Sequence, residues 1–86
     1  MQSMLEMGQI KNAILKTLED AEVKITNPQK DGLHFEAVVI SSLFEGKSLV
    51  EQHQIVMLAL SHLFSSSLHA LRLKTYTPAE WEKVDT

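Results

Sequence analysis

The chain has 86 residues, with 44% hydrophobic and 22% charged side chains, a composition that is typical of a folded domain and excludes a disordered one. Because this length leaves room for one hydrophobic core, we expect residues 1–86 to form a single domain. The net charge of −3 is unlike the basic balance of most nucleic-acid-binding domains, and the absence of cysteine excludes disulfides, thiolate nucleophiles and clusters held by four thiolates.

The first predicted element is an amphipathic helix over about residues 5–19, where apolar side chains recur at helical spacing. Charged Lys16 and Glu19 lie on the opposite side. The apolar face consists of Met7, Ile10, Ala13, Ile14 and Leu18.

Two strands follow. Residues 21–26 alternate between apolar and polar side chains, and residues 34–41 are rich in valine and isoleucine. Between them, residues 27–33 contain Asn-Pro and Asp-Gly pairs, which favour a turn. The side chains expected to point inward are Val23, Ile25, Phe35, Ala37 and Val39.

A second helix is predicted from Ser48 to about Phe64, after a connector at residues 43–47 that contains Gly46. Ser48 and Glu51 have the spacing of a capping box, which favours a helix start there. The expected buried stripe is Leu49, Val56, Leu60, Leu63 and Phe64.

The C-terminal part predicts a third strand and a closing helix. Three serines at residues 65–67 interrupt the long helix, and residues 68–75 have the composition of a strand. Residues 77–80 read Thr-Pro-Ala-Glu, an N-cap followed by proline at the first helical position, so a short helix carrying Trp81 follows. Alternation places His69, Leu71 and Leu73 on one strand face, and Leu68, Ala70, Arg72 and Lys74 on the other.

The order helix, strand, strand, helix, strand, helix predicts an α+β fold with a three-stranded sheet and helices packed on one face. Because a helix connects the second and third strands, the third strand is expected to pair in parallel with an earlier one. The predicted sheet is therefore mixed.

The compartment predicted from the sequence is the cytoplasm. Residues 1–10 lack the basic start and apolar run of a signal peptide, and the longest apolar stretch, residues 55–60, is too short to cross a bilayer. We also expect no membrane partner and a monomer when the protein is free.

Several ordered segments together resemble the BolA family. Residues 44–50, Phe-Glu-Gly-Lys-Ser-Leu-Val, are similar to the family's segment before its long helix, and residues 74–81 are similar to its C-terminal signature. The other matching positions are His34-Phe35, His53, Val56 and residues 68–71. The resemblance extends in register over about residues 10–81.

This resemblance implies a fold similar to a class II KH domain and partnership with a monothiol glutaredoxin. In such complexes a [2Fe-2S] cluster is held by glutaredoxin cysteine and glutathione on one side and by BolA histidine on the other. The family histidine matches His69. A second family ligand comes from the loop before the second strand, where this chain offers His34. The isolated chain is expected to bind no cofactor.

The residues by themselves leave alternatives for both histidines. His69 shares a strand face with Leu71 and Leu73, which favours a packed histidine, whereas the family pattern favours a ligand. His34 alternates with Phe35 and is expected to face away from the core, where a strand histidine is either a simple surface residue or a ligand. Neutral imidazole binds iron when thiolate is lacking, and its protonation prevents binding.

The remaining two histidines lie on the long helix. His53 falls close in angle to Leu49 and Leu60, so a packing role is favoured over a metal role. His62 lies on the opposite side with Glu51 and is expected to be a surface residue.

The alternative function is a nucleic-acid-binding regulator that uses the KH-like surface. Its candidate residues are Lys47, His53, Arg72 and Lys74. The net charge weighs against it, as do Gln52 and Gln54, which replace arginines that often flank the family's helix histidine. A single glycine, Gly46, also makes residues 46–49 a connector rather than the glycine clamp of a KH domain.

No Ser-His-Asp set, paired carboxylates, phosphate loop or metalloprotease spacing is visible in the sequence, so we expect no enzyme. The leading hypothesis is an adaptor in iron–sulfur cluster assembly or trafficking, with DNA binding possible but disfavoured. A third possibility is an interaction module that binds glutaredoxin without metal.

Overall fold

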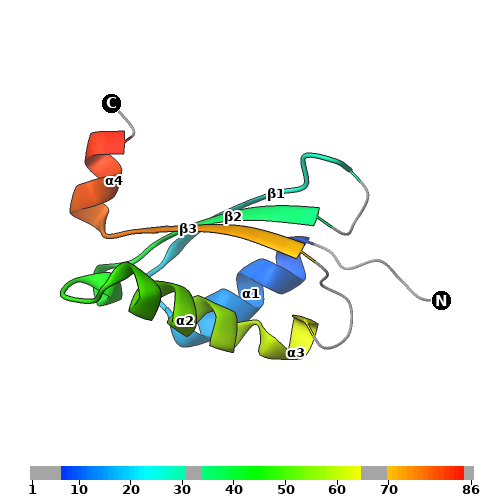
Figure 1. The fold of residues 1–86 in the computed structure, drawn as a ribbon, viewed down its shortest axis with the longest axis horizontal. Helices are drawn as coiled ribbons and strands as arrows, with labels where there is room; N and C mark the ends of the chain where they lie inside the picture. Colours follow the sequence, from blue (N-terminus) through cyan, green and yellow to red (C-terminus); the bar gives the residue numbers. More distant parts are fainter. Residues whose placement is uncertain (1–6, 31–33, 65–69, 85–86) are drawn as a thin grey trace.

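The computed structural model describes residues 7–30, 34–64 and 70–84 (Figure 1). Helices and strands alternate in the predicted order, with one additional 3-10 turn and a division of the long helix. The elements are α1 (Met7–Thr17), β1 (Glu22–Thr26), β2 (His34–Ile40), η1 (Ser42–Phe44), α2 (Leu49–Ala59), α3 (Ser61–Phe64), β3 (Ala70–Tyr76) and α4 (Pro78–Val84).

The three strands form one mixed sheet in the order β1-β2-β3. β1 pairs antiparallel with β2, with Val23 opposite Val39. β3 pairs parallel with β2, with Phe35 beside Leu71, and this confirms the predicted crossover. β2 is therefore the central strand, and both β1 and β3 are edges.

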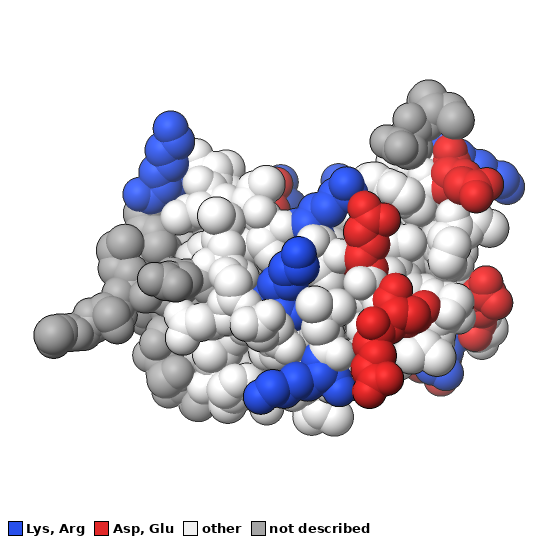
Figure 2. All heavy atoms as spheres, turned by 180° about the vertical axis from the view of Figure 1, so that it is seen from behind, with Lys and Arg blue, Asp and Glu red and all other residues white. Residues whose placement is uncertain are grey.

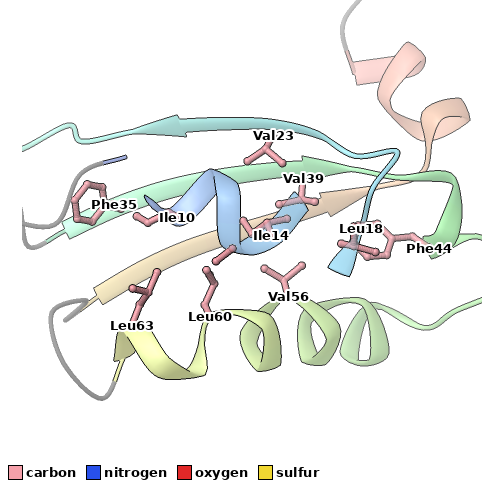
Figure 3. Packing of buried hydrophobic residues seen from close by; sticks show 11 residues of the cluster. Ile10, Ile14, Leu18, Val23, Phe35, Val39, Phe44, Val56, Leu60 and Leu63 are labelled. Carbon is pink, nitrogen blue, oxygen red and sulfur yellow. The ribbon is translucent and has the colours of Figure 1, made fainter. Parts of the chain in front are cut away.

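The core lies between the sheet and helices α1 to α3 (Figure 3). Each strand sends alternate side chains toward these helices, as the period of two requires. Helix α2 contributes residues four apart, Val56 and Leu60, neither of which is exposed. The other buried apolar members are Ile10, Ala13, Ile14, Leu18, Val23, Phe35, Val39, Phe44 and Leu63.

Helix α4 is the exception to the predicted arrangement of helices on one face. It follows the C-terminal end of β3 and rises on the other side of the sheet (Figure 1). The ring of Trp81 lies 5.2 Å from that of Tyr76 at an angle of 55°. The Lys24 ammonium, on the uncovered sheet face, lies 5.7 Å from the centre of the Trp81 ring. A short helix with one large aromatic residue thus covers one end of this face.

Two capping boxes fix where α2 and α4 begin. The backbone N–H of Ser48 donates to Glu51 at 2.8 Å, and that of Glu51 donates to the Ser48 hydroxyl at 3.1 Å. The same exchange joins Thr77 and Glu80, at 2.9 and 3.2 Å. Both helix starts predicted from the sequence are confirmed.

The long helix differs from the prediction at two places. It ends at Ala59, and the Leu60 N–H reaches the carbonyls of both Val56 and Met57, which tightens the last turn before α3. Leu49, predicted to be buried, is 61% exposed. It occupies the first helical position, where the chain has only just left the connector and the stripe has not yet reached the core.

Candidate functional site

His34 begins β2 and is exposed. It shares the uncovered face of the sheet with Glu36, because side chains two positions apart point the same way. The parallel register pairs His34 with Ala70, the first residue of β3. The structure therefore places His34 away from the core, as predicted, and at the end of the sheet where β2 and β3 both begin.

A pocket of about 380 Å³ lies at this end of the sheet. The turn that follows β1 forms one wall, and the first residues of β2 and β3 form the floor. The lining residues are Pro28, Gln29, His34, Phe35, Glu36, Ala70, Leu71 and Arg72. The candidate ligand His34 thus belongs to a concave surface and not to a flat strand.

His69, the other predicted ligand, lies outside the described residues. In the chain it directly precedes Ala70, the residue beside His34 in the register. Among the described residues, no three histidine, aspartate or glutamate side chains are close enough to hold a metal ion together.

Arg72 forms an ion pair across the two parallel strands of this pocket. Its guanidinium lies 3.6 Å from the carboxylate of Glu36, and the arginine side chain is 74% exposed. Exposed pairs of this kind contribute little to stability. Arg72 and Glu36 therefore place one positive and one negative charge beside His34, both accessible to a partner.

The other candidates of the nucleic-acid hypothesis gather at a different place. Lys47, His53 and Lys74 line two neighbouring pockets between β3 and the first half of α2, whereas Arg72 lines the pocket of His34. The four residues proposed as one surface are therefore divided between two sites.

Charges are mixed on the rest of the surface as well. On the face shown in Figure 2, basic side chains lie next to a group of acidic ones and form no continuous basic area. This agrees with the net charge of −3 and offers no broad electrostatic footprint for a phosphate backbone on that face.

His53 and His62 lie as the helix pattern predicts. His53 is half-buried and lines the pocket that also contains Leu49, Leu73 and Lys74. His62 is exposed on α3. Neither histidine lines the pocket of His34.

Gln52 is a structural residue that the sequence interpretation misplaced. We took it for a surface residue whose lack of charge weakens DNA binding, but it is only 6% exposed. Its side-chain NH2 donates to the carbonyls of Lys47 at 3.0 Å and Phe44 at 3.4 Å, and its Oε1 accepts from the Thr75 hydroxyl at 2.7 Å. A glutamine four positions before buried Val56 was the available signal, because it falls on the core side of the helix.

A second polar connection joins the turn after α1 to the end of β2. The hydroxyl of buried Ser41 donates to Asp20 at 2.6 Å, and the N–H and hydroxyl of Ser42 donate to the same carboxylate at 2.9 and 2.5 Å. These hydrogen bonds, first those of Ser41 and Ser42 hydroxyls, lower the pKa of Asp20 below its ordinary value.

The described residues contain no helix of the length and apolar character needed to span a membrane. Helix α2, with 11 residues, is much shorter than the about 20 residues that a crossing requires.

Comparisons with known proteins place the chain in a family. Residues 9–80 match the family model described as BolA-like protein. The acid stress protein IbaG of Escherichia coli is 32% identical over 80 residues, which cover 92% of each chain. The DNA-binding transcriptional regulator BolA of the same organism is 39% identical over 49 residues, covering 57% of this chain and 47% of that protein.

A solved structure agrees with the sequence comparison. A BolA protein homologue from Coxiella burnetii superimposes with a TM-score of 0.79 at 41% identity, covering 92% of this chain and 99% of that one. The relatives named here are called stress proteins or regulators, and none of these names describes an enzyme. On the match of residues 9–80 and on this shared fold, the chain belongs to the BolA-like family.

Proposed function

We propose that this protein is an adaptor in iron–sulfur cluster assembly or trafficking that shares a [2Fe-2S] cluster with a monothiol glutaredoxin in the cytoplasm. The cluster is cargo in this proposal and not a resident cofactor. His34 and His69 bind iron from this side, and the partner supplies cysteine and glutathione thiolates. The protein itself carries out no catalytic reaction.

The observation that carries the proposal is the register of β2 and β3. His34 lies beside Ala70 on the neighbouring parallel strand, and Ala70 is bonded to His69. Neighbouring strands are about 4.8 Å apart, and consecutive Cα atoms are about 3.8 Å apart. The two histidines therefore enter the sheet at the same end, a separation that suits ligands of one small cluster.

The chemistry of the donor set also supports sharing. Iron–sulfur clusters are usually held by four thiolates, and this chain has no cysteine. Imidazole is a competent ligand in its neutral form and raises the reduction potential of the cluster relative to thiolate. Two histidines would leave the remaining positions to a thiolate partner, which favours a cluster that is passed on.

The pocket beside His34 supplies a place for the partner's contact. It has a volume of about 380 Å³ and opens on the uncovered sheet face. Glu36 and Arg72 flank it with opposite charges. An approaching thiolate-bound cluster meets a mixed polar rim, and in this proposal the rim orients the glutaredoxin before iron is bound.

The test is to mix the protein with a monothiol glutaredoxin, glutathione, ferrous iron and sulfide, and to record visible circular dichroism. The expected result is a spectrum that differs from that of the glutaredoxin homodimer. His34→Ala and His69→Ala should each lose part or all of this difference, whereas His62→Ala should retain it. An unchanged homodimer spectrum with the wild-type protein would contradict the proposal.

Metal-free association is separated from this function by comparing affinities. The adaptor predicts tighter binding to cluster-loaded glutaredoxin than to the apo form, measured by calorimetry under anaerobic conditions. Equal affinities would favour an interaction module that needs no metal.

A second candidate function, a nucleic-acid-binding regulator, is motivated by the similarity to the regulator BolA of Escherichia coli. Lys47, His53 and Lys74 near one groove would contact the backbone. The mixed charges and the division of Arg72 from this group weigh against it. A duplex mobility shift that persists at physiological salt and weakens with added salt would support this function.

A further inference from the structure

The outer edge of β3 carries backbone groups that β2 does not use. The N–H of Ser41 donates to the carbonyl of Tyr76 at 3.0 Å, so Tyr76 directs its backbone groups toward β2. Because this direction alternates along a strand, the backbone groups of Leu73 and Thr75 point to the opposite edge. Among the described residues no fourth strand pairs with that edge.

A groove runs along this edge, between β3 and the first half of α2. Two pockets of about 390 and 280 Å³ adjoin there and share Leu49, Thr75 and Tyr76. We call this surface the β3–α2 groove. Leu49 is 61% exposed and Val84, on α4, is 52% exposed. The groove therefore combines free strand edges with two large apolar side chains that the rest of the described chain leaves uncovered.

The floor of the groove is held in place by the buried hydrogen bonds of Gln52. This side chain joins Thr75 on β3 to the carbonyl of Lys47 in the connector before α2. Strand, connector and helix are thus tied together at the groove, which reduces the cost of ordering the surface when a ligand binds.

The charged side chains at the groove are mainly basic. Lys47 and Lys74 line it, together with half-buried His53, against one acidic residue, Glu80. Glu80 is occupied by the backbone N–H of Thr77 in the capping box of α4. In a chain with net charge −3, this local excess of positive charge favours an acidic ligand.

We propose that the β3–α2 groove binds an extended, acidic peptide segment of a partner protein, which adds to the edge of β3 as a further strand. Backbone hydrogen bonds to Leu73 and Thr75 supply the pairing. Alternate apolar side chains of the peptide pack against Leu49, and acidic side chains reach Lys47 and Lys74. Groove binding by strand addition is a general mode of peptide recognition.

The groove favours a peptide over a nucleic acid for two reasons. The free backbone groups of Leu73 and Thr75 are spaced for another β-strand and would be left without partners under a phosphate backbone. The exposed apolar side chain of Leu49 offers aliphatic packing, whereas single-stranded nucleic acids need aromatic platforms for their bases.

The first experiment selects peptides from a phage-displayed library of random dodecamers on the full-length wild-type protein, with Leu49→Asp as the counter-selection. The expected result is enrichment of sequences that alternate apolar and acidic residues. If no sequence is enriched over the Leu49→Asp protein, or if the enriched sequences are basic, the proposal is overturned.

The enriched peptide then locates the site. Fluorescence anisotropy should show about tenfold weaker binding to Leu49→Asp and Lys74→Glu, while Val50→Asp and Lys11→Glu bind as the wild type does. Val50 is the matched control because it is 66% exposed and adjacent in sequence, but does not line the groove. Equal effects of Leu49→Asp and Val50→Asp would overturn the assignment to the groove.

Strand addition is tested on the peptide backbone itself. N-methylation of alternate residues removes the hydrogen-bond donors of one edge without changing the side chains. One of the two alternating N-methyl series should abolish binding, and the other should leave it within about twofold. If both series bind equally, no strand is added, and if a single-stranded octanucleotide displaces the peptide with higher affinity, the groove belongs to nucleic acid. Both outcomes contradict the proposal.

Discussion

The hydroxyl of Thr75 donates to Oε1 of Gln52 at 2.7 Å, and both side chains are at least 94% buried. This hydrogen bond joins the edge strand β3 to helix α2 across a part of the core where apolar packing would be expected. It fixes the helix relative to the strand and, through Lys47, also fixes the connector.

Removal of this bond should be costly. Thr75→Val keeps the shape of the side chain but leaves Gln52 Oε1 without its donor, and we expect a loss of about 1–2 kcal/mol in the free energy of unfolding. Gln52→Leu should cost about as much or more because the carbonyl of Lys47 also loses its donor. Urea denaturation measures both. Gln54→Leu, on the exposed side of α2, is the control and should change stability by less than about 0.5 kcal/mol.

Core and surface leucines of the same helical region should respond very differently. Leu60 is not exposed and Leu58 is 77% exposed. Leu60→Ala removes a side chain that packs between helix and sheet, and we expect a loss of about 2–5 kcal/mol. Leu58→Ala should cost less than about 0.5 kcal/mol. Thermal or urea unfolding distinguishes them, and comparable losses would show that the burial of Leu60 is wrongly assigned.

Asp20 should make stability depend on pH in the acidic range. Hydrogen bonds from Ser41 and Ser42 lower the pKa of Asp20 in the folded protein from its ordinary value of 3.8. The carboxylate therefore stabilises the fold above that value, and this contribution is lost as pH falls through the lower folded pKa. Because the side chain is exposed, the contribution at neutral pH is modest, about 0.5–1 kcal/mol.

The measurement compares wild type with Asp20→Asn by urea denaturation between about pH 3 and pH 7. We expect the wild type to be more stable at neutral pH and the difference to shrink as the solution becomes acidic. A difference that stays constant over the whole range would rule out the charge of Asp20 as its origin.

The proposed shared cluster should be sensitive to acid because protonated imidazole does not bind iron. Visible absorption of the complex with glutaredoxin should fall as pH is lowered from about 8 to about 5. His34→Cys offers a thiolate at the same place and should retain a cluster with an altered spectrum, whereas His34→Ala should not retain the mixed-ligand spectrum. If His34→Ala and the wild type give the same spectrum and acid response, His34 is not a ligand.

Much of the fold could be predicted from sequence because its signals are local. The two capping boxes, Ser48 with Glu51 and Thr77 with Glu80, define helix starts through hydrogen bonds over three residues. The alternation in β2 likewise placed Phe35 and Val39 inside. Such signals need only a few neighbouring residues, so tertiary structure had little opportunity to override them.

The candidate site was predicted less completely. His34 was correctly placed on the uncovered face by alternation, and its role as a ligand stays a prediction. The grouping of Lys47 with Arg72 was wrong, because the two residues line different pockets. Periodicity assigns a face to each element, but it does not state which end of one element lies beside which end of another.

The sequence by itself determined the element types, their order and the mixed sheet, since hydrophobic period, turn residues and caps are properties of short segments. Only the tertiary structure decided that Gln52 is buried, that Leu49 is exposed and that α4 lies on the other side of the sheet. These features depend on the packing of segments far apart in the chain. A polar side chain such as Gln52 is buried where distant groups satisfy its hydrogen bonds, and those groups become its neighbours only on folding.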